Sequence, residues 1–211
     1  MRRLEIPQGD CSAIRLVSED GVKKLERFAE LVCRWTTKIN LVSRSTIPEL
    51  WDRHIVDSVQ LFSCANEQQR LWLDIGSGGG FPGIVIAVLA EEFTPKLGVT
   101  LVESDKRKSV FLSEACRQLG LAATVHCQRS ENLAPQAACV VSARALAPLT
   151  QLCAHAERHL RSGGTCAFLK GASADDEVVE ARKLWKFDLD RLESLTDKRS
   201  SVLFLKGLGR V

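Results

Sequence analysis

The sequence predicts an α/β protein whose mainly parallel, seven-stranded sheet is covered by helices on both faces. From residue 71 onward, short apolar segments alternate with segments of helical periodicity, which is typical of such sheets. Strands are expected over residues 71–75, 99–103, 122–127, 139–142 and 165–169. Helices are expected near residues 83–91, 106–119, 148–160 and 174–185. A strand at 201–206, paired with the region 187–195, is expected to close the sheet as an antiparallel pair.

The first third of the chain predicts a helical extension that precedes the sheet. Ser18 can cap a helix, and Pro48 suits the first turn of a second helical segment near residues 48–64. The first helix is expected from apolar residues spaced three or four apart: Val22, Leu25, Phe28, Ala29, Val32, Trp35 and Ile39. A polar stretch follows at 65–70, so residues 1–66 are expected to form the extension and residues 67–211 the α/β domain.

The composition is that of an ordinary globular protein. Of 211 residues, 45% are hydrophobic and 26% charged, and the net charge of +3 permits a polyanionic partner without requiring one. The eight cysteines, from Cys11 to Cys166, show no C-x-x-C spacing and lie mostly in apolar stretches, so free thiols are expected. The N-terminus has no apolar segment after its charges, and no apolar run approaches the roughly 20 residues of a membrane span. These features predict a cytoplasmic protein.

A glycine-rich loop follows the first expected strand of the sheet. Five glycines occur in eight positions between Asp74 and the next helix: Gly76, Gly78, Gly79, Gly80 and Gly83. Glycines let the backbone turn sharply and approach a ligand closely, and the start of the helix offers free N–H groups. The loop therefore predicts a cofactor site.

Two cofactor classes fit this loop. Gly78, Gly80 and Gly83 satisfy the G-x-G-x-x-G pattern, so a dinucleotide-dependent oxidoreductase is one interpretation. S-adenosylmethionine is favoured because the carboxylate of Asp74 can face a cationic sulfonium, whereas it would repel a pyrophosphate. The helical segments before the loop favour the same cofactor. Glu103, at the end of the second strand, can bind a ribose diol in either case.

Several further motifs occur in a fixed order along the chain. The loop reads Asp-Ile-Gly-Ser-Gly-Gly-Gly-Phe-Pro-Gly at residues 74–83. The others are Ile-Asn-Leu-Val-Ser at 39–43, Arg-His-Ile-Val-Asp-Ser at 53–58, Glu-Ser at 103–104, Arg-Lys at 107–108, Phe-Leu at 111–112, Gln-Arg-Ser-Glu at 128–131, Ser-Ala-Arg-Ala at 142–145 and Leu-Lys-Gly at 169–171. From about residue 20 to the C-terminus, this ordered set resembles the RsmG (GidB) family of bacterial 16S ribosomal RNA guanine-N7 methyltransferases.

The resemblance implies a class I S-adenosylmethionine-dependent methyltransferase fold, Rossmann-like, with a helical N-terminal extension. It implies S-adenosyl-L-methionine as the cofactor and methyl transfer to N7 of a guanine in 16S rRNA. The RNA partner is either the free rRNA or the small ribosomal subunit, including an assembly intermediate. A monomer is expected, with no membrane and no metal. A catalytically silent RNA-binding assembly factor is the non-enzymatic alternative.

The resemblance also implies a set of cofactor-binding positions. They are Gly76, Phe81, Glu103, Ser130, Glu131 and Arg144, to which the glycine loop itself adds Asp74 and Gly78. Gly76 and Phe81 are expected around the methionine part of the cofactor, and Glu103 at the ribose. Ser130 and Glu131 are expected on the adenine side. The chain departs from the family pattern at Gly79 and Phe81, where relatives often have Pro or Ala and Leu, and at Ala143 between Ser142 and Arg144.

Arg144 is the expected catalytic residue. Guanine N7 carries an in-plane lone pair at neutral pH, so its attack needs alignment and electrostatics more than a general base. The chain lacks the Asn-Pro-Pro-aromatic motif used on exocyclic amines and a Pro-Cys nucleophile for cytosine C5. Arg144 is expected to hold the cofactor or the O6 atom of guanine. The alternative is a structural salt bridge from Arg144 to Glu131 or Asp74.

Basic residues are expected to form a rim around the cofactor cleft that contacts RNA phosphates. They are Arg53, Arg107, Lys108, Arg129 and Lys170, with Lys23, Lys24 and Arg27 in the extension. Each of them alone is also compatible with a solvated surface charge. His54 and Asp57 are expected either to support the cleft or to pack the helix. His155 and His159 lack an H-E-x-x-H arrangement and a third ligand, so no metal site is expected there.

Overall fold

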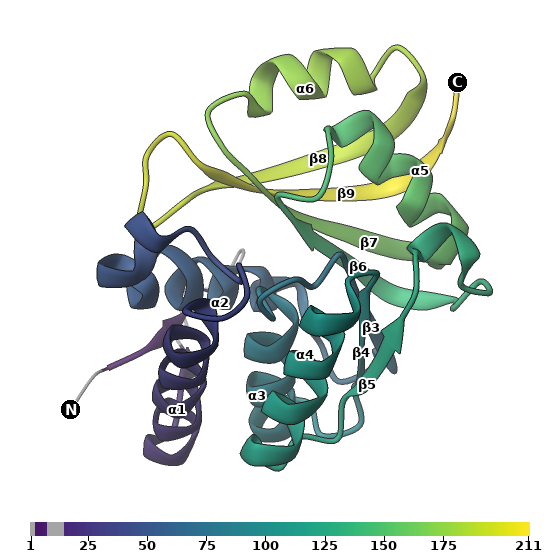
Figure 1. Ribbon diagram of the computed structural model, residues 1–211. Coiled ribbons are helices and arrows are strands. Elements are labelled where there is room, and N and C mark those ends of the chain that lie inside the picture. Colours follow the sequence, from purple (N-terminus) through teal and green to yellow (C-terminus); the bar gives the residue numbers. More distant parts are fainter. Residues whose placement is uncertain (1–2, 8–14) are drawn as a thin grey trace.

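A seven-stranded sheet forms the centre of the computed structural model, which describes residues 3–7 and 15–211 (Figure 1). The order across the sheet is β5-β4-β3-β6-β7-β9-β8. The parallel strands are β3 (Leu71–Ile75), β4 (Gly98–Glu103), β5 (Thr124–Cys127), β6 (Ala138–Arg144) and β7 (Leu160–Lys170). Strand β9 (Ser201–Arg210) pairs antiparallel with both β7 and β8 (Trp185–Glu193). The mainly parallel sheet expected from the sequence is therefore confirmed.

The strand order reverses beside β3, and this reversal positions the site. The chain passes from β3 to β4 and β5 on one side, and then returns to place β6 and β7 on the other side. In open parallel sheets, a crevice forms at such a point, outside the carboxyl ends of the strands. The loops that follow β3, β4 and β6 meet at this crevice.

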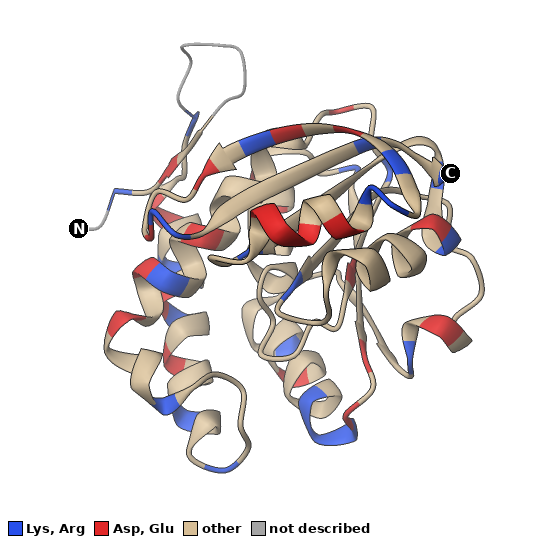
Figure 2. Ribbon diagram, turned by 90° about the horizontal axis from the view of Figure 1, so that it is seen from above, with Lys and Arg blue, Asp and Glu red and all other residues tan. Residues whose placement is uncertain are grey.

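Helices cover both faces of the sheet (Figure 1). Helices α1 (Glu19–Thr36), α3 (Gly83–Phe93) and α4 (Lys106–Leu119) lie on one side, and α5 (Leu149–His159) and α6 (Ala174–Ala181) lie on the other. Figure 2 shows that Lys and Arg are interspersed with Asp and Glu along the ribbon. The central strands of the sheet are thus shielded from water on both faces, whereas the edge strand β8 keeps exposed residues.

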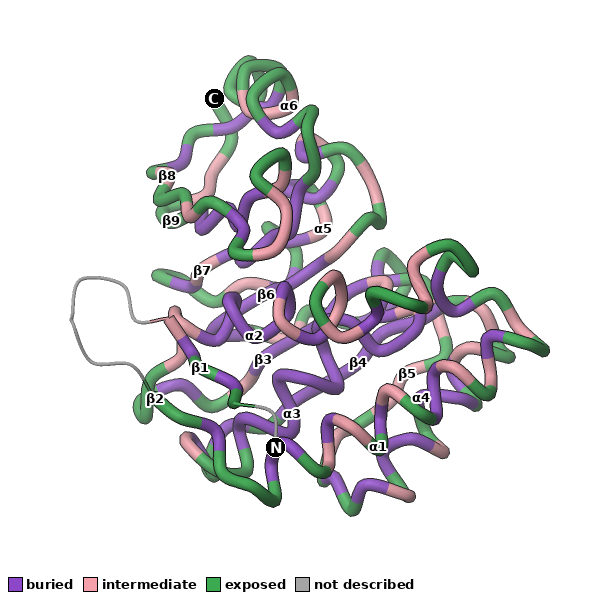
Figure 3. The backbone as a smooth tube through the Cα atoms, turned by 90° about the vertical axis from the view of Figure 1, so that its left-hand side faces the viewer, coloured by how far each residue is buried: buried purple, intermediate pink, exposed green. Residues whose placement is uncertain are grey.

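The sheet separates two hydrophobic cores, one on each face. Successive residues of a strand contribute to them in turn, because their side chains point to opposite faces. In β3, Trp72 belongs to the core beneath α1, α3 and α4, whereas Leu73 and Ile75 belong to the core beneath α5. Helix α3 is buried from Gly83 to Ala90, as the buried tube in Figure 3 shows. It is buried all round because α1 and α2 pack on the side that faces away from the sheet.

The helical extension shares its core with the sheet. Ser18 caps α1 as expected, accepting a hydrogen bond from the Gly21 amide at 3.1 Å. The Phe28 ring of α1 lies 5.0 Å from the Phe81 ring of the glycine loop and 6.5 Å from the Phe111 ring of α4. The division of the chain at residues 66 and 67 stays a prediction about chain organisation. In the described residues, the two parts pack as layers of one core.

Several expected boundaries are wrong. The second expected helix is divided into a 3-10 helix, η1 (Arg44–Glu49), a π-helix, η2 (Trp51–Val56), α2 (Asp57–Leu61) and a short 3-10 turn, η3 (Phe62–Cys64). Pro48 falls inside η1, where its missing N–H prevents a regular α-helix. Helix α6 ends at Ala181, and β7 already begins at Leu160. A small antiparallel pair, β1 (Glu5–Ile6) and β2 (Arg15–Leu16), was not predicted.

Two further sequence expectations concern the cysteines and the possibility of a membrane span. Their cysteines are free thiols, and Cys116, Cys139, Cys153 and Cys166 are buried; Cys11 lies outside the described residues. Within residues 3–7 and 15–211, no helix has the length and apolar character needed to cross a membrane.

Candidate active site

The loop between β3 and α3 turns through glycines in the left-handed region. The φ angles of Gly76, Gly78 and Gly80 are +66°, +52° and +88°. At Gly76, an added Cβ would lie 2.6 Å from Cδ1 of Leu146, so Leu146 would have to shift, and the positive φ would strain any other residue. These positions explain why the turn requires glycine, and they leave backbone atoms exposed to the crevice.

Glu103 joins the end of β4 to this loop. One of its carboxylate oxygens accepts a hydrogen bond from the Gly78 amide at 2.8 Å, and the other accepts one from the Asp105 amide at 2.7 Å. The side chain lines the cavity beside the loop. Because each carboxylate oxygen has a further lone pair, Glu103 can still accept hydrogen bonds from a ligand.

Asp74 has a different position from the one expected. It is fully buried, and its two oxygens accept hydrogen bonds from the Ser142 hydroxyl at 2.6 Å and the Gly83 amide at 3.2 Å. Burial raises the pKa of Asp74 to about 7, although the bonds from Ser142 and Gly83 oppose the shift. The expectation that this carboxylate faces a cationic ligand is therefore corrected: it holds the start of α3 against strand β6.

Two adjoining cavities open at the crevice and share Gly76, Ser104 and Leu146 as lining residues. The larger has a volume of about 440 Å³ and is lined by the loop, Glu103, Arg144 and His54. The smaller has a volume of about 210 Å³ and is lined by Ser130, Glu131, Arg129 and His155 among others. The residues expected to bind the cofactor, Asp74 excepted, thus line one continuous crevice.

The smaller cavity contains a hydrogen-bonded cluster. The Ser130 hydroxyl lies 3.2 Å from the Glu131 carboxylate and 3.1 Å from Nδ1 of His155. A hydrogen bond from its own backbone lowers the pKa of Glu131, against the effect of burial, and His155 lowers it further. Nε2 of His159 bonds to the Ser130 carbonyl at 2.9 Å. The two histidines therefore hold this wall, and the described residues contain no group of side chains that could hold a metal ion.

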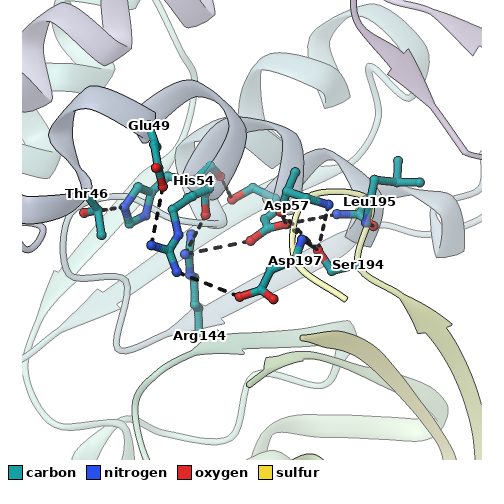
Figure 4. A network of polar contacts seen from close by, with 12 residues as sticks. Thr46, Glu49, His54, Asp57, Arg144, Ser194, Leu195 and Asp197 are labelled. Carbon is teal, nitrogen blue, oxygen red and sulfur yellow. Dashed lines mark hydrogen bonds and ion pairs between the residues drawn. The ribbon is translucent and has the colours of Figure 1, made fainter. Parts of the chain in front are cut away.

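Arg144 lines the larger cavity and is held by the helical extension (Figure 4). Its Nη2 donates to the Arg53 carbonyl at 2.6 Å and lies 4.0 Å from the carboxylate of Asp57. Asp57 in turn accepts a hydrogen bond from Ser194, in the connection between β8 and β9, at 2.8 Å. The alternative of a salt bridge to Glu131 or Asp74 is therefore wrong, because the acidic partner is Asp57.

His54 reaches the larger cavity from the helical extension, together with Leu41, Val42 and Ser43. Its ring lies 5.0 Å from the Phe81 ring, and Nε2 lies 3.0 Å from the Thr46 hydroxyl. Burial, together with the charges of Arg144 and Arg53, lowers the pKa of His54 to about 3. His54 is therefore neutral at physiological pH.

The expected basic rim is only partly present. Lys108 lines the larger cavity and Arg129 the smaller one. Arg107 is exposed and lies 3.7 Å from Asp105, while Arg53 lies 3.9 Å from Asp197. Lys23 and Lys24 pair with acidic residues at the surface.

Lys170 does not belong to this rim. Its side chain is only 8% exposed and lies 2.6 Å from the Glu177 carboxylate. It also donates to the Ala147 carbonyl at 3.1 Å, and Glu177 accepts a 2.7 Å bond from the Leu149 amide. The expectation that Lys170 contacts RNA is corrected: this pair fixes the loop between β6 and α5. The sequence contained the two charges but no signal that α6 brings them together.

Comparison with known proteins assigns the chain to a family. The family model described as "GidB: rRNA small subunit methyltransferase G" matches residues 21–203. The chain belongs to this family. A protein of Cereibacter sphaeroides named ribosomal RNA small subunit methyltransferase G is 48% identical over 195 residues, covering 92% of this chain and 95% of that protein. A protein of the same name from Ruegeria is 49% identical over 196 residues, with coverages of 92% and 95%.

Solved structures show the same fold at low sequence identity. TYW2 of M. jannaschii, solved in complex with AdoMet, has a TM-score of 0.57 and 13% identity, covering 100% of this chain and 89% of its own. A protein of Agrobacterium tumefaciens described as a predicted O-methyltransferase has a TM-score of 0.57 and 18% identity, with coverages of 72% and 81%. The class I methyltransferase fold is therefore confirmed. Membership of the GidB family makes the chain a methyltransferase and favours this activity over a dinucleotide-dependent oxidoreductase.

Proposed function

We propose that this protein transfers the methyl group of S-adenosyl-L-methionine to N7 of a guanine in 16S rRNA, either free or within the small ribosomal subunit. The observation that carries the proposal is the crevice at the end of β3, where Glu103 and Arg144 line one cavity in a chain of this family. We also propose that the protein acts as a cytoplasmic monomer without a metal.

The residues of the crevice fit this cofactor. Gly76 and Gly78 carry no side chain at two positions of the loop that line the cavity, and an added Cβ at Gly78 would point to within 4.0 Å of the Glu103 carboxylate. Glu103 would hold the ribose hydroxyls and place a negative charge near a sulfonium. The smaller cavity, with Ser130 and Glu131, would hold the adenine. Gly76 and Phe81 would contact the methionine part in the larger cavity.

The larger cavity suits a nucleophile that needs no deprotonation. When bound, the cofactor supplies a methyl group on a positively charged sulfur. Because N7 attacks with its own lone pair, no side chain has to remove a proton first. His54, whose pKa is about 3, is too weak a base for that task, whereas Arg144 remains a hydrogen-bond donor. The chain thus supplies orientation and electrostatic stabilisation, which are the main contributions such a reaction requires.

The test is methyl transfer by purified protein to naked 16S rRNA and to isolated small subunits, followed by mass mapping of the modified base. We expect one 7-methylguanine. Binding of S-adenosylhomocysteine and RNA without transfer to either substrate would support the silent assembly factor instead. If the protein binds NAD and does not bind S-adenosylhomocysteine, the proposal that S-adenosyl-L-methionine is its cofactor is wrong.

A further inference from the structure

The hydrogen bonds of His54 determine which of its ring nitrogens carries the proton. The Thr46 hydroxyl donates its single proton to the Ser43 carbonyl at 2.8 Å. It can therefore only accept from Nε2 of His54, which lies 3.0 Å away. Since the ring is neutral, the proton on Nε2 leaves Nδ1 as a bare acceptor. Among the described residues, Nδ1 has no hydrogen-bond partner, and His54 lines the larger cavity.

Arg144 lines the same cavity and carries the complementary group, a hydrogen-bond donor. Its Nη2 is engaged by the Arg53 carbonyl, whereas Nη1 is buried and has no partner among the described residues. A buried donor without a partner is costly and therefore rare in folded proteins. Arg144 and His54 both belong to the polar network drawn in Figure 4, and both line the larger cavity. Two residues that line this cavity thus carry an unpaired donor atom and an unpaired acceptor atom.

We propose that Nδ1 of His54 and Nη1 of Arg144 select guanine, by accepting from its N1–H and donating to its O6. This inference rests on the proposed function. O6 lies between N1–H and N7 along the edge of guanine, so this pairing leaves N7 without a hydrogen bond and free to accept the methyl group. Adenine presents an amino donor in place of O6 and a bare N1 in place of N1–H, so both contacts would fail. His54 therefore gives the helical extension a direct part in choosing the base.

The decisive experiment uses base analogues at the mapped guanine of 16S rRNA. Inosine keeps N1–H, O6 and N7, whereas 2-aminopurine keeps N7 but lacks both N1–H and O6. We expect wild-type kcat/KM to be similar for guanine and inosine and about tenfold or more lower for 2-aminopurine. In His54→Phe, which keeps a ring against Phe81, kcat/KM for guanine and inosine should fall by about tenfold or more, with 2-aminopurine little changed. His54→Asn, which keeps an acceptor near the Nδ1 position, should recover part of the loss.

Two results would overturn the inference. The first is an unchanged ratio of guanine to 2-aminopurine in His54→Phe. The second is a rise in the Kd of S-adenosylhomocysteine that accounts for the whole loss, since His54 would then serve an N–H donor of the cofactor. If His54→Phe does not fold, Thr46→Val replaces it. That change removes the partner of Nε2, so the proton is no longer fixed on Nε2 and Nδ1 is no longer always an acceptor. The ratio of kcat/KM for guanine to that for 2-aminopurine should therefore fall, and an unchanged ratio counts against the inference. Absence of wild-type transfer would instead contradict the proposed function.

Discussion

Nη2 of Arg144, at the end of strand β6, donates a 2.6 Å hydrogen bond to the main-chain carbonyl of Arg53 in the helical extension. The guanidinium is therefore placed by a segment far away in the sequence, with Asp57 of the same segment 4.0 Å away. The extension forms one wall of the larger cavity in addition to covering the sheet.

Replacement of Arg144 by Lys should lower kcat/KM for methyl transfer by about a hundredfold. A single ammonium cannot both reach the Arg53 carbonyl and present a donor to the cavity. Methyl transfer to 16S rRNA measures the effect, and thermal unfolding tests whether the fold is kept. Arg117→Lys is the matched control, because Arg117 is exposed on α4 and pairs with Glu114. If Arg144→Lys turns over at the wild-type rate, the Arg144 guanidinium has no part in the reaction.

Glu103→Gln should raise the Kd of S-adenosylhomocysteine by about tenfold. The Gly78 and Asp105 amides bond to different oxygens of Glu103, and in Gln one of these oxygens becomes an NH2 group, which cannot accept from an N–H. Either the loop or the ligand contact is therefore weakened. Titration calorimetry measures the Kd. Glu114→Gln on α4 is the control, and equal affinities for the two variants would refute a ribose-binding role.

Asp74→Asn should become more stable relative to the wild type as the pH rises. The folded pKa of Asp74 is about 7, above the usual value of 3.8, so the folded protein binds more protons than the unfolded chain between these values. The stability that belongs to the protonated carboxyl is lost as the pH rises through 7, whereas Asn does not titrate. Urea unfolding should show a relative gain of about 2 kcal/mol between pH 5 and pH 7. A constant difference across this range would mean that Asp74 titrates normally.

Lys170→Met should destabilise the fold by about 3 kcal/mol, because it leaves the carboxylate of Glu177 without its cation. Lys170→Met combined with Glu177→Gln should recover part of this loss, and a double-mutant cycle in urea measures the coupling. The affinity for RNA should change little. If Lys170→Met kept its stability but bound RNA more weakly, Lys170 would contact RNA, as the sequence predicted.

Arg129→Gln and Lys108→Gln should each reduce the slope of log Kd against log salt for 16S rRNA by about 1. Both side chains lie at the crevice, where they can reach phosphates that flank the target base. Lys183→Gln is the control, because Lys183 pairs with Glu180 near α6 on the opposite face. The same slope for all three variants would show that RNA approaches elsewhere.

The elements predicted best are those with local signals. The central strands and helix α4 follow from hydrophobic periodicity, and helix α1 from its Ser18 cap and apolar spacing. The segment around Pro48 was predicted poorly, because its 3-10 and π turns have no local sequence signal and depend on tertiary packing such as that of η2 against α1. The crevice residues Gly76 and Glu103 were found because each directly follows or ends a strand whose position the pattern gives.

The sequence by itself determined the order of strands and helices, the glycine turn and the family, because these depend on residue types at fixed spacings. Only the tertiary structure decided that Asp74 holds α3, that Lys170 pairs with Glu177, and that Arg144 pairs with Asp57. A charged side chain shows in the sequence only that it needs a partner. Which partner it finds depends on how elements distant along the chain are packed against one another.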